Sequence, residues 1–363
     1  MKSAKRTDGR RGWALLAVLS AAVGTAACGA KHGAYAPEAP MVADAQGNVV
    51  SAYAADRQGP ARGAKNTESY GHIVENDFLR AAESPLSTFS IDVDTASYSN
   101  VRRFLRDGSL PPADAVRIEE LINYFPYDYP DPTGAEPFAV AADVTGCPWN
   151  PKHRLLRVGL QGKRMPAAET PPRNLVFLLD VSGSMEDPRK LPLLRSGFSL
   201  LAQQLRPNDT VAIVVYAGAS GLVLPPTPGS DRATIIDALL RLQAGGSTNG
   251  GEGIELAYRM ARQSFKRGGI NRVILATDGD FNVGVTSQGE LIRLIERQRE
   301  SGVFLTVLGL GTGNLKDSTM EQLADKGNGN YAYIDTLREA RKVLVEQAGS
   351  CLLYTSDAAD DNR

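Results

Sequence analysis

The sequence predicts a doubly wound α/β fold, in which a mostly parallel β-sheet is covered by helices on both faces. From residue 174 onward, nearly continuous apolar runs alternate with segments whose apolar residues recur at helical spacing. Strands that are apolar on both sides are typical of a sheet that is buried on both faces. The apolar runs are 175–179, 211–215, 273–276 and 303–308.

The helices between these strands are predicted from single apolar stripes. The stripes are Leu191, Leu194, Phe198, Leu201 and Leu205, then Ile235, Ile236, Leu239 and Leu240, then Leu291, Ile292 and Ile295. Ser318 and Glu321 form a capping box for a further helix, which Gly327 is expected to end. Prolines in the run 221–226 predict a short strand at the edge of the sheet, where a missing N–H is tolerated.

A small α+β module is predicted before this sheet, so that residues 70–150 form the module and 151–350 the main domain. In the module, a strand over 88–93 precedes a helix that ends at Gly108. A second helix follows Asp114, which is expected to cap it, and its apolar stripe is expected to dock on another element. That stripe consists of Ile118, Leu121, Ile122 and Phe125.

The first 27 residues have the pattern of an export signal: a basic start, an apolar run over 13–23, and small residues before Cys28. The apolar run is too short to span a membrane. The Thr-Ala-Ala-Cys ending resembles a bacterial lipobox, although Thr25 stands where leucine is usual. The resemblance implies that an acylated Cys28 anchors the protein in the lipid bilayer of the cell envelope. The competing interpretation is an ordinary signal peptide with an incidental Cys28.

If the protein is a lipoprotein, Gly29 resembles the sorting pattern for the outer membrane, facing the periplasm, rather than the inner membrane. Residues 28–69 are rich in alanine, glycine and proline and are predicted to be a flexible tether, with a root-mean-square span of roughly 35 Å.

The chain has a net charge of −1, and its first 27 residues contain five basic residues and one acidic residue. The remainder of the chain is therefore acidic. Binding to nucleic acid is therefore not expected.

The last residues are not expected to be native. Residues 351–361 read Cys-Leu-Leu-Tyr-Thr-Ser-Asp-Ala-Ala-Asp-Asp, which resembles the translation of a transposase sequencing adapter in one frame. We therefore expect 351–363 to be an artefact and the natural protein to continue beyond it.

The chain contains three cysteines, Cys28, Cys147 and Cys351, and no two of them form a CxxC motif. No thiolate metal site is therefore predicted.

Five oxygen-bearing side chains are predicted to meet at one edge of the sheet. The buried strand that ends at Leu179 runs into Asp180-Val-Ser182-Gly-Ser184, a glycine-rich loop carries Thr248, and Asp278 follows a later strand. Singly, such residues are common in turns and caps, but three loops that supply donors at strand ends favour a ligand site. Carboxylate and hydroxyl oxygens suit Mg²⁺ or Mn²⁺ rather than zinc.

These motifs resemble the metal-ion-dependent adhesion site of von Willebrand factor type A (VWA) domains, which have a Rossmann-like doubly wound sheet. The resemblance implies that Asp180, Ser182, Ser184 and Thr248 lie at or near a Mg²⁺ ion, and that Asp278 holds it directly or through water; Mn²⁺ and Ca²⁺ are alternatives. From about residue 87 to 346 the chain also resembles bacterial lipoproteins with a small module before such a domain and a further module after it.

The predicted function is metal-dependent protein binding, for adhesion or assembly, in the bacterial cell envelope. One open octahedral position on the ion would be completed by an aspartate or glutamate of the protein partner. The alternative is an envelope scaffold lipoprotein with a non-functional metal site, which binds through its other modules. Metal chelation and Asp180→Ala separate the two hypotheses.

The sequence does not predict an enzyme. It contains neither the nucleophile motif GxSxG nor the phosphate loop GxxxxGK. Gly309-Leu-Gly311-Thr-Gly313 lacks the spacing of a dinucleotide fingerprint and follows a late strand, so we interpret it as a turn from strand to helix and expect no nucleotide ligand.

Overall fold

The computed structural model describes residues 41–43, 49–51, 66–74, 76–80, 82–87, 93–165, 169–217, 220–246, 250–279 and 288–347. The chain divides into two compact units, Met1–Gly63 and Ala64–Arg363. The first contains a short antiparallel pair, β1 (Met41–Ala43) and β2 (Val49–Ser51), inside the segment predicted to be a structureless tether. The predicted signal peptide, Cys28 and residues 351–363 lie outside the described residues.

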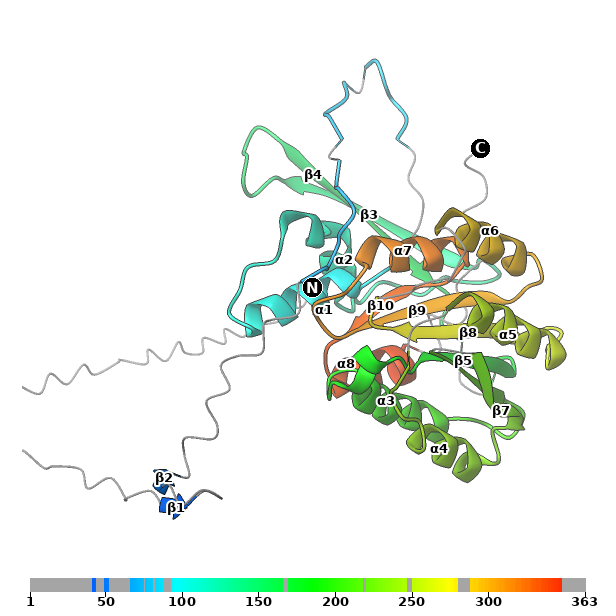
Figure 1. Cartoon of the computed structure of the whole chain (residues 1–363). Helices are drawn as coiled ribbons and strands as arrows, with labels where there is room; N and C mark the ends of the chain where they lie inside the picture. Colours follow the sequence, from blue (N-terminus) through cyan, green and yellow to red (C-terminus); the bar gives the residue numbers. More distant parts are fainter. Residues whose placement is uncertain are drawn as a thin grey trace, which may run out of the picture. The chain divides into compact units, whose positions relative to one another are not determined.

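The second unit contains a six-stranded sheet in the order β10-β9-β8-β5-β6-β7 (Figure 1). All neighbouring strands are parallel except β7, which runs antiparallel to β6 at one edge, where its prolines were expected. The strands are β5 (Arg173–Asp180), β6 (Thr210–Tyr216), β7 (Ser220–Pro228), β8 (Ile270–Thr277), β9 (Phe304–Leu310) and β10 (Tyr331–Ile334). The predicted doubly wound α/β fold is confirmed.

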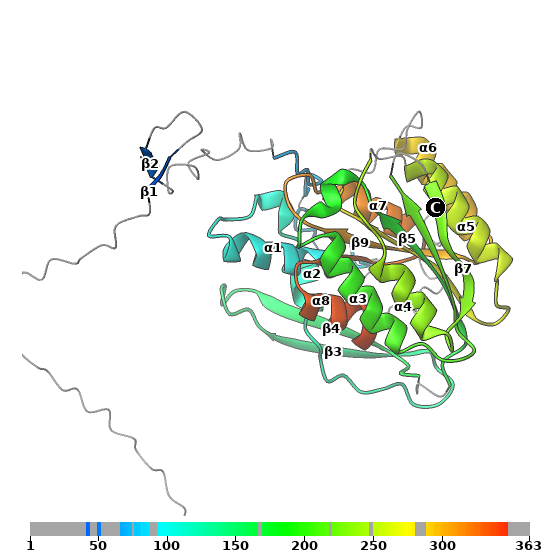
Figure 2. The ribbon, with the colours of Figure 1, turned by 60° about the horizontal axis from the view of Figure 1, so that its bottom comes forward.

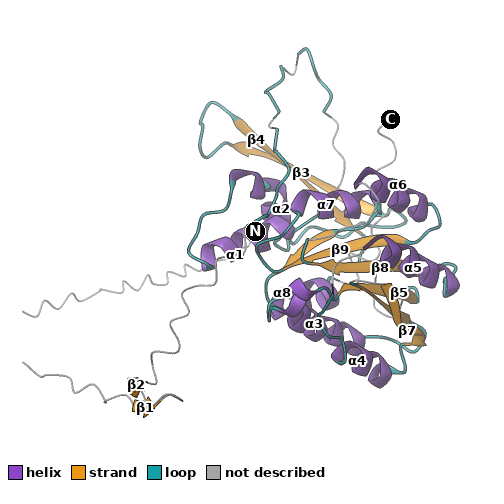
Figure 3. Ribbon diagram, viewed as in Figure 1, coloured by secondary structure: helices purple, strands orange, loops and turns teal. Residues whose placement is uncertain are grey.

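Helices cover both faces of this sheet (Figures 1 and 3). One face, in front in Figure 2, carries α3 (Leu191–Gln203), α4 (Arg232–Leu240) and α8 (Leu337–Arg341), the last continued by the π-helix η4 (Lys342–Glu346). The other face carries α5 (Gly250–Gln263), α6 (Gln288–Arg299) and α7 (Asp317–Lys326). Each layer of helices encloses a hydrophobic core against the sheet. Successive residues of β5 point to opposite faces, so Phe177 lies in the first core and Leu178 in the second.

The helix α5 and the strand β10 have no counterpart among the sequence predictions. The apolar stripe of α5 contains alanines and follows glycines, so its sequence signal is weak. The predicted capping box of α7 is wrong: Lys316 is the N-cap residue and makes no side-chain cap bond, although Gly327 ends the helix as predicted. Among the described residues, no helix is long and apolar enough to cross a bilayer.

The amino-terminal helices dock on the open edge of the sheet through polar contacts. α1 (Ala96–Arg106) lies beside β10, where Ser99 Oγ donates to the Tyr333 carbonyl at 2.7 Å. The Asp94 carboxylate accepts from the Tyr331 N–H at 2.8 Å. These two bonds satisfy backbone groups of an edge strand that would otherwise be open to pairing with another chain.

The second amino-terminal helix, α2 (Ile118–Asn123), follows a 3-10 turn, η2 (Ala113–Ala115), and its N-cap residue is Arg117 instead of Asp114. The expectation that its apolar stripe docks is met only in part: Leu121 is half-buried, and the Phe125 ring packs edge-on against Tyr98 of α1, with 5.1 Å between the ring centroids. Ile118, Ile122 and Phe125 are all about half exposed or more, whereas Glu120 is buried. The helix is instead held by the buried guanidinium of Arg117, which pairs with Glu120 and with Asp317 at the start of α7.

A segment that precedes these helices joins the loop between β9 and α7. Thr67 N donates to the Gly313 carbonyl at 2.7 Å, and Ser69 N donates to the Leu315 carbonyl at 2.9 Å. Asp317 N returns a bond to the Ser69 carbonyl at 3.0 Å. The leading segment is therefore fastened to a loop at the carboxyl edge of the sheet.

A separate antiparallel hairpin joins the amino-terminal helices to the main sheet. It consists of β3 (Phe138–Gly146) and β4 (Arg154–Gly162), so the boundary predicted at residue 150 falls within a hairpin. An exposed ion pair, Arg157 with Asp143, lies on one of its faces. The other face is apolar and open, with Val144 68% and Leu156 61% exposed.

Replacing Phe177 by alanine is expected to lower the free energy of unfolding by about 3–5 kcal/mol, because a fully buried ring would leave a cavity. The Phe177 ring lies 4.4 Å from that of Phe198, measured between ring centroids. Urea unfolding measures the change. The exposed Leu240→Ala is the control, with an expected loss under about 1 kcal/mol, and equal losses in the two variants would contradict the assigned core.

The pH dependence of stability is expected to involve Glu321, which lies 3.6 Å from Arg117. Burial, opposed by Arg117 and reinforced by Asp317 and Glu120, raises the pKa of Glu321 to about 7 from its ordinary 4.5. The folded protein then binds a proton more readily than the unfolded chain, so the free energy of unfolding falls as pH rises between these values.

The variant Glu321→Gln, which has no charge to bury, is expected to stabilise the protein near pH 8 by roughly 1 kcal/mol or more and to change little near pH 4. Thermal unfolding at both pH values measures this, with the exposed Glu346→Gln as control. A variant that keeps the wild-type pH dependence would show that Glu321 does not cause it.

Candidate functional site

The carboxylate of Asp180 is buried at the end of β5, the strand in the middle of the sheet. One oxygen, Oδ1, accepts a bond from Ser182 N at 2.9 Å. The other, Oδ2, accepts from Thr277 Oγ1 at 3.1 Å and from the Tyr216 hydroxyl at 3.3 Å. Burial raises the pKa of Asp180 to about 6, in spite of the hydrogen bonds from Ser182 that lower it.

The two serine hydroxyls link Asp180 to the end of a neighbouring strand. Ser182 and Ser184 lie where β5 runs into the 3-10 helix η3 (Gly183–Glu186), with their Oγ atoms 3.2 Å apart. Ser184 Oγ donates to Asp278 Oδ2 at 2.6 Å. Asp278 directly follows β8, which is paired with β5, so parallel pairing of the two strands brings the carboxylates to one edge of the sheet.

Two glycines allow other loops to approach these residues. Gly279, next to Asp278, has φ 110°, and a Cβ at that position would lie 2.4 Å from the Asn314 carbonyl oxygen. Gly246 accepts a bond from Gly183 N at 3.1 Å, so the start of the glycine-rich loop lies against η3. Thr248, the predicted ligand on that loop, lies outside the described residues.

A lysine that the sequence analysis did not single out occupies the same site. Lys190, which is 6% exposed, donates from Nζ to Asp278 Oδ2 at 2.8 Å and to Asn314 Oδ1 at 3.3 Å. Burial would raise the pKa of Asp278, but the bonds from Lys190 and Ser184 outweigh it and hold that pKa below its ordinary value. Lys190 is the N-cap residue of α3, where a positive charge is unfavourable for the helix dipole, and this is the signal in the sequence that could have revealed it.

The donor set fits a small divalent cation of the Mg²⁺ type. Two carboxylates and two hydroxyls converge, and all of their donor atoms are hard oxygens. Among the described residues, no group of three or more His, Cys, Asp or Glu side chains is placed to hold a metal ion. Lys190 already supplies one positive charge to Asp278, and a bound cation would compete with it.

Comparison with known families agrees with the fold. Residues 174–347 match the model of the von Willebrand factor type A domain, and residues 64–157 match a second model described as von Willebrand factor. The mixed, mostly parallel sheet between two layers of helices is the fold of that domain. The second part of the chain is therefore a von Willebrand factor type A domain, a class that generally serves protein interaction.

Among curated proteins, the chain is similar to the uncharacterized protein YfbK of Escherichia coli, with 48% identity over 294 residues, 79% of this chain and 51% of that protein. It is also similar to the uncharacterized protein sll0103 of Synechocystis, with 28% identity over 188 residues, 52% of this chain and 43% of that protein. The chain spans about half the length of these curated relatives.

Among solved structures, a von Willebrand factor type A protein from Catenulispora acidiphila is similar, with 20% identity and a TM-score of 0.44. The similarity covers 55% of this chain and 45% of that one.

Replacing Lys190 by methionine is expected to destabilise the protein in the presence of a chelator by about 3–5 kcal/mol, because Asp278 then loses its buried counter-charge. Urea unfolding measures this loss, and the exposed Lys163→Met is the control. A loss of less than about 1 kcal/mol would show that the ion pair does not hold the site together.

Proposed function

We propose that this chain is a metal-dependent protein-binding module for adhesion or assembly in the bacterial cell envelope. Its site would consist of Asp180, Ser182, Ser184, Thr248 and Asp278. The observation that carries the proposal is the convergence of the Asp180 and Asp278 carboxylates, through two serine hydroxyls, at the carboxyl edge of the sheet. This edge is where doubly wound folds bind their ligands.

The chemistry of the proposed site follows from charge. Mg²⁺, with Mn²⁺ and Ca²⁺ as alternatives, would supply a coordination position for an acidic side chain of the protein partner. The protein contributes two carboxylates, which attract the cation, and neutral hydroxyls, which coordinate it without adding negative charge. Because Lys190 offsets one carboxylate, affinity for the metal is set by competition between the cation and an ammonium group.

The envelope part of the proposal depends on the first residues of the chain. An export signal followed by an acylated Cys28 would anchor the module in the lipid bilayer, in the outer membrane facing the periplasm. Neither a nucleotide nor a nucleic acid is part of the proposed function. No enzymatic activity is proposed.

A second candidate function is an envelope scaffold whose metal site is non-functional. The ion pair between Lys190 and Asp278 favours this alternative, because it satisfies the carboxylate without any metal. In that case binding would depend on other parts of the protein, and neither a chelator nor a substitution of Asp180 would change it.

The proposed site predicts that Mg²⁺ or Mn²⁺ raises the melting temperature of the protein and that Asp180→Ala removes this rise. A cation at a hundred times its dissociation constant stabilises the folded state by about 2.7 kcal/mol. Thermal unfolding with and without chelator measures the effect, and Asp237→Ala, which removes an exposed carboxylate from α4, is the matched control.

A rise that Asp180→Ala removes and Asp237→Ala keeps supports the metal site. An identical melting temperature with Mg²⁺, with Mn²⁺ and with chelator in the wild type would favour the scaffold.

A further inference from the structure

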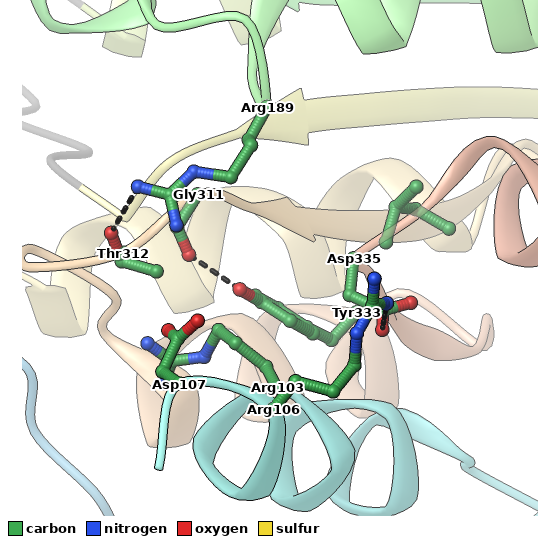
Figure 4. Close-up of a pocket in the computed structure, with 9 residues that line it drawn as sticks. Arg103, Arg106, Asp107, Arg189, Gly311, Thr312, Tyr333 and Asp335 are labelled. Atoms are coloured by element: carbon green, nitrogen blue, oxygen red, sulfur yellow. Dashed lines mark hydrogen bonds and ion pairs between the residues drawn. The ribbon is translucent and has the colours of Figure 1, made fainter. Parts of the chain in front are cut away.

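A cavity of about 220 Å³ opens at the same carboxyl edge of the sheet, beside the ends of β9 and β10. Three arginines and two aspartates line it, and the carboxyl end of α1 forms one of its walls (Figure 4). The arginines are Arg103, Arg106 and Arg189, and the aspartates are Asp107 and Asp335. We refer to it as the arginine cavity.

The arginine cavity shares a wall with the site described above. Gly311, which lines the cavity, has φ 72°, and a Cβ there would lie 2.1 Å from Cε of Lys190. The ammonium of Lys190 contacts Asp278, and the preceding residue, Arg189, lines the cavity. Residues 189 and 190 therefore contribute one side chain to the arginine cavity and one to the site around Asp278.

Partners within the fold already neutralise some of the charged groups of the cavity. Arg103 makes two bonds to the Glu68 carboxylate, at 3.0 and 2.9 Å. Asp335 is held by two bonds from Arg102, at 2.9 and 2.5 Å. These pairs are structural. Arg106 and Arg189 form more exposed ion pairs, with Asp335 and Asp187, and Asp107 also lines the cavity.

The two remaining guanidinium groups are weakly engaged. Arg106 is 62% exposed, lies 3.7 Å from Asp335, and donates no hydrogen bond from its side chain within the described part of the chain. Arg189 is 53% exposed; its guanidinium forms an ion pair with Asp187 through bonds of 3.3 and 3.5 Å and donates to Thr312 Oγ1 at 3.3 Å. Two guanidinium groups that are more than half exposed therefore line the arginine cavity beside Asp107, each with one carboxylate partner in the fold, Asp335 for Arg106 and Asp187 for Arg189.

We propose that the arginine cavity binds a second carboxylate of the same protein partner whose first carboxylate is bound at the metal. This inference rests on the proposed function. It adds that the partner carries two acidic residues a short distance apart, one for the metal and one for the cavity. A planar carboxylate matches the fork of donors on an arginine side chain. It also gives the amino-terminal module a role in binding, because α1 supplies Arg106 while the von Willebrand factor type A domain supplies Arg189.

The test compares probes with one and with two carboxylates. The first probe is acetyl-aspartyl amide, and the second is a series of blocked peptides with two aspartates separated by glycine spacers of increasing length. Binding to the chain is measured by nuclear magnetic resonance titration, with Mg²⁺ or with chelator. The proteins are wild type, Asp180→Ala, the double variant Arg106→Gln with Arg189→Gln, and Arg241→Gln, an exposed arginine outside the cavity, as control.

With Mg²⁺, the best two-aspartate peptide is expected to bind the wild type at least about tenfold more tightly than the single aspartate, because the second contact becomes intramolecular. The double arginine variant is expected to lose this gain and keep Mg²⁺-dependent binding of the single aspartate. Arg241→Gln is expected to keep both. Both replaced arginines are more than half exposed, and thermal unfolding verifies that the variant is folded.

The outcomes separate the two proposals. If both probes bind equally, or if the gain survives in the double variant, the arginine cavity is not a carboxylate site, whereas the metal site stands. If no binding depends on Mg²⁺ or on Asp180, the proposed function fails. Residual binding that the double variant loses would then support the cavity alone, and residual binding that it keeps would overturn it.

Discussion

The burial of Asp180 is the constraint on which the rest of the site depends. Every residue of β5 is buried, so the strand delivers a carboxylate to a place where water cannot solvate it. Burying an ionised carboxylate without partners is costly, and the fold surrounds this one with hydroxyl and backbone donors from three elements. Asp278, only one strand away, requires a cation, and in this structure the ammonium of Lys190 supplies it. The hydroxyls around Asp180 and the ammonium of Lys190 therefore compensate the cost of burying two negatively charged carboxylates.

The same principle governs how the amino-terminal helices join the sheet. Their contacts with β10 and α7 are ion pairs and hydrogen bonds from buried polar side chains, such as Ser99 and Arg117. Such contacts require matched partners, so they fix orientation more strictly than an apolar stripe would. The position of α1, and with it that of Arg106, is therefore defined relative to the ends of β9 and β10. The arginine cavity is lined jointly by two segments that are far apart in the sequence.

The sequence predicts the sheet well because buried parallel strands and amphipathic helices have strong periodic signals. It also predicts that Asp180, Ser182, Ser184 and Asp278 lie together, because parallel strands end at one edge. It does not predict Lys190, whose role depends on how the residue before α3 lies against the loops that follow β8 and β9. Nor does it predict the docking of α2, in which Glu120 is buried and Ile118 is exposed. The helix α5 is not predicted, because glycines and alanines lie between the large apolar residues of its buried face and weaken the periodic signal. The failures at Lys190 and at α2 share one cause: pairing between polar groups distant in sequence leaves no periodic pattern.

The attachment of the leading segment has a mechanical consequence. Thr67 and Ser69 are bonded to the loop between β9 and α7, and Asn314 on that loop contacts Lys190. Tension applied to the chain ahead of residue 67 would therefore act first on a few backbone bonds at the carboxyl edge of the sheet, before it reached the core. In an anchored protein that holds a partner, traction on the anchor would act directly on the loop that carries Asn314. The lifetime of the attachment under force would then depend on those bonds as well as on the affinity of the site.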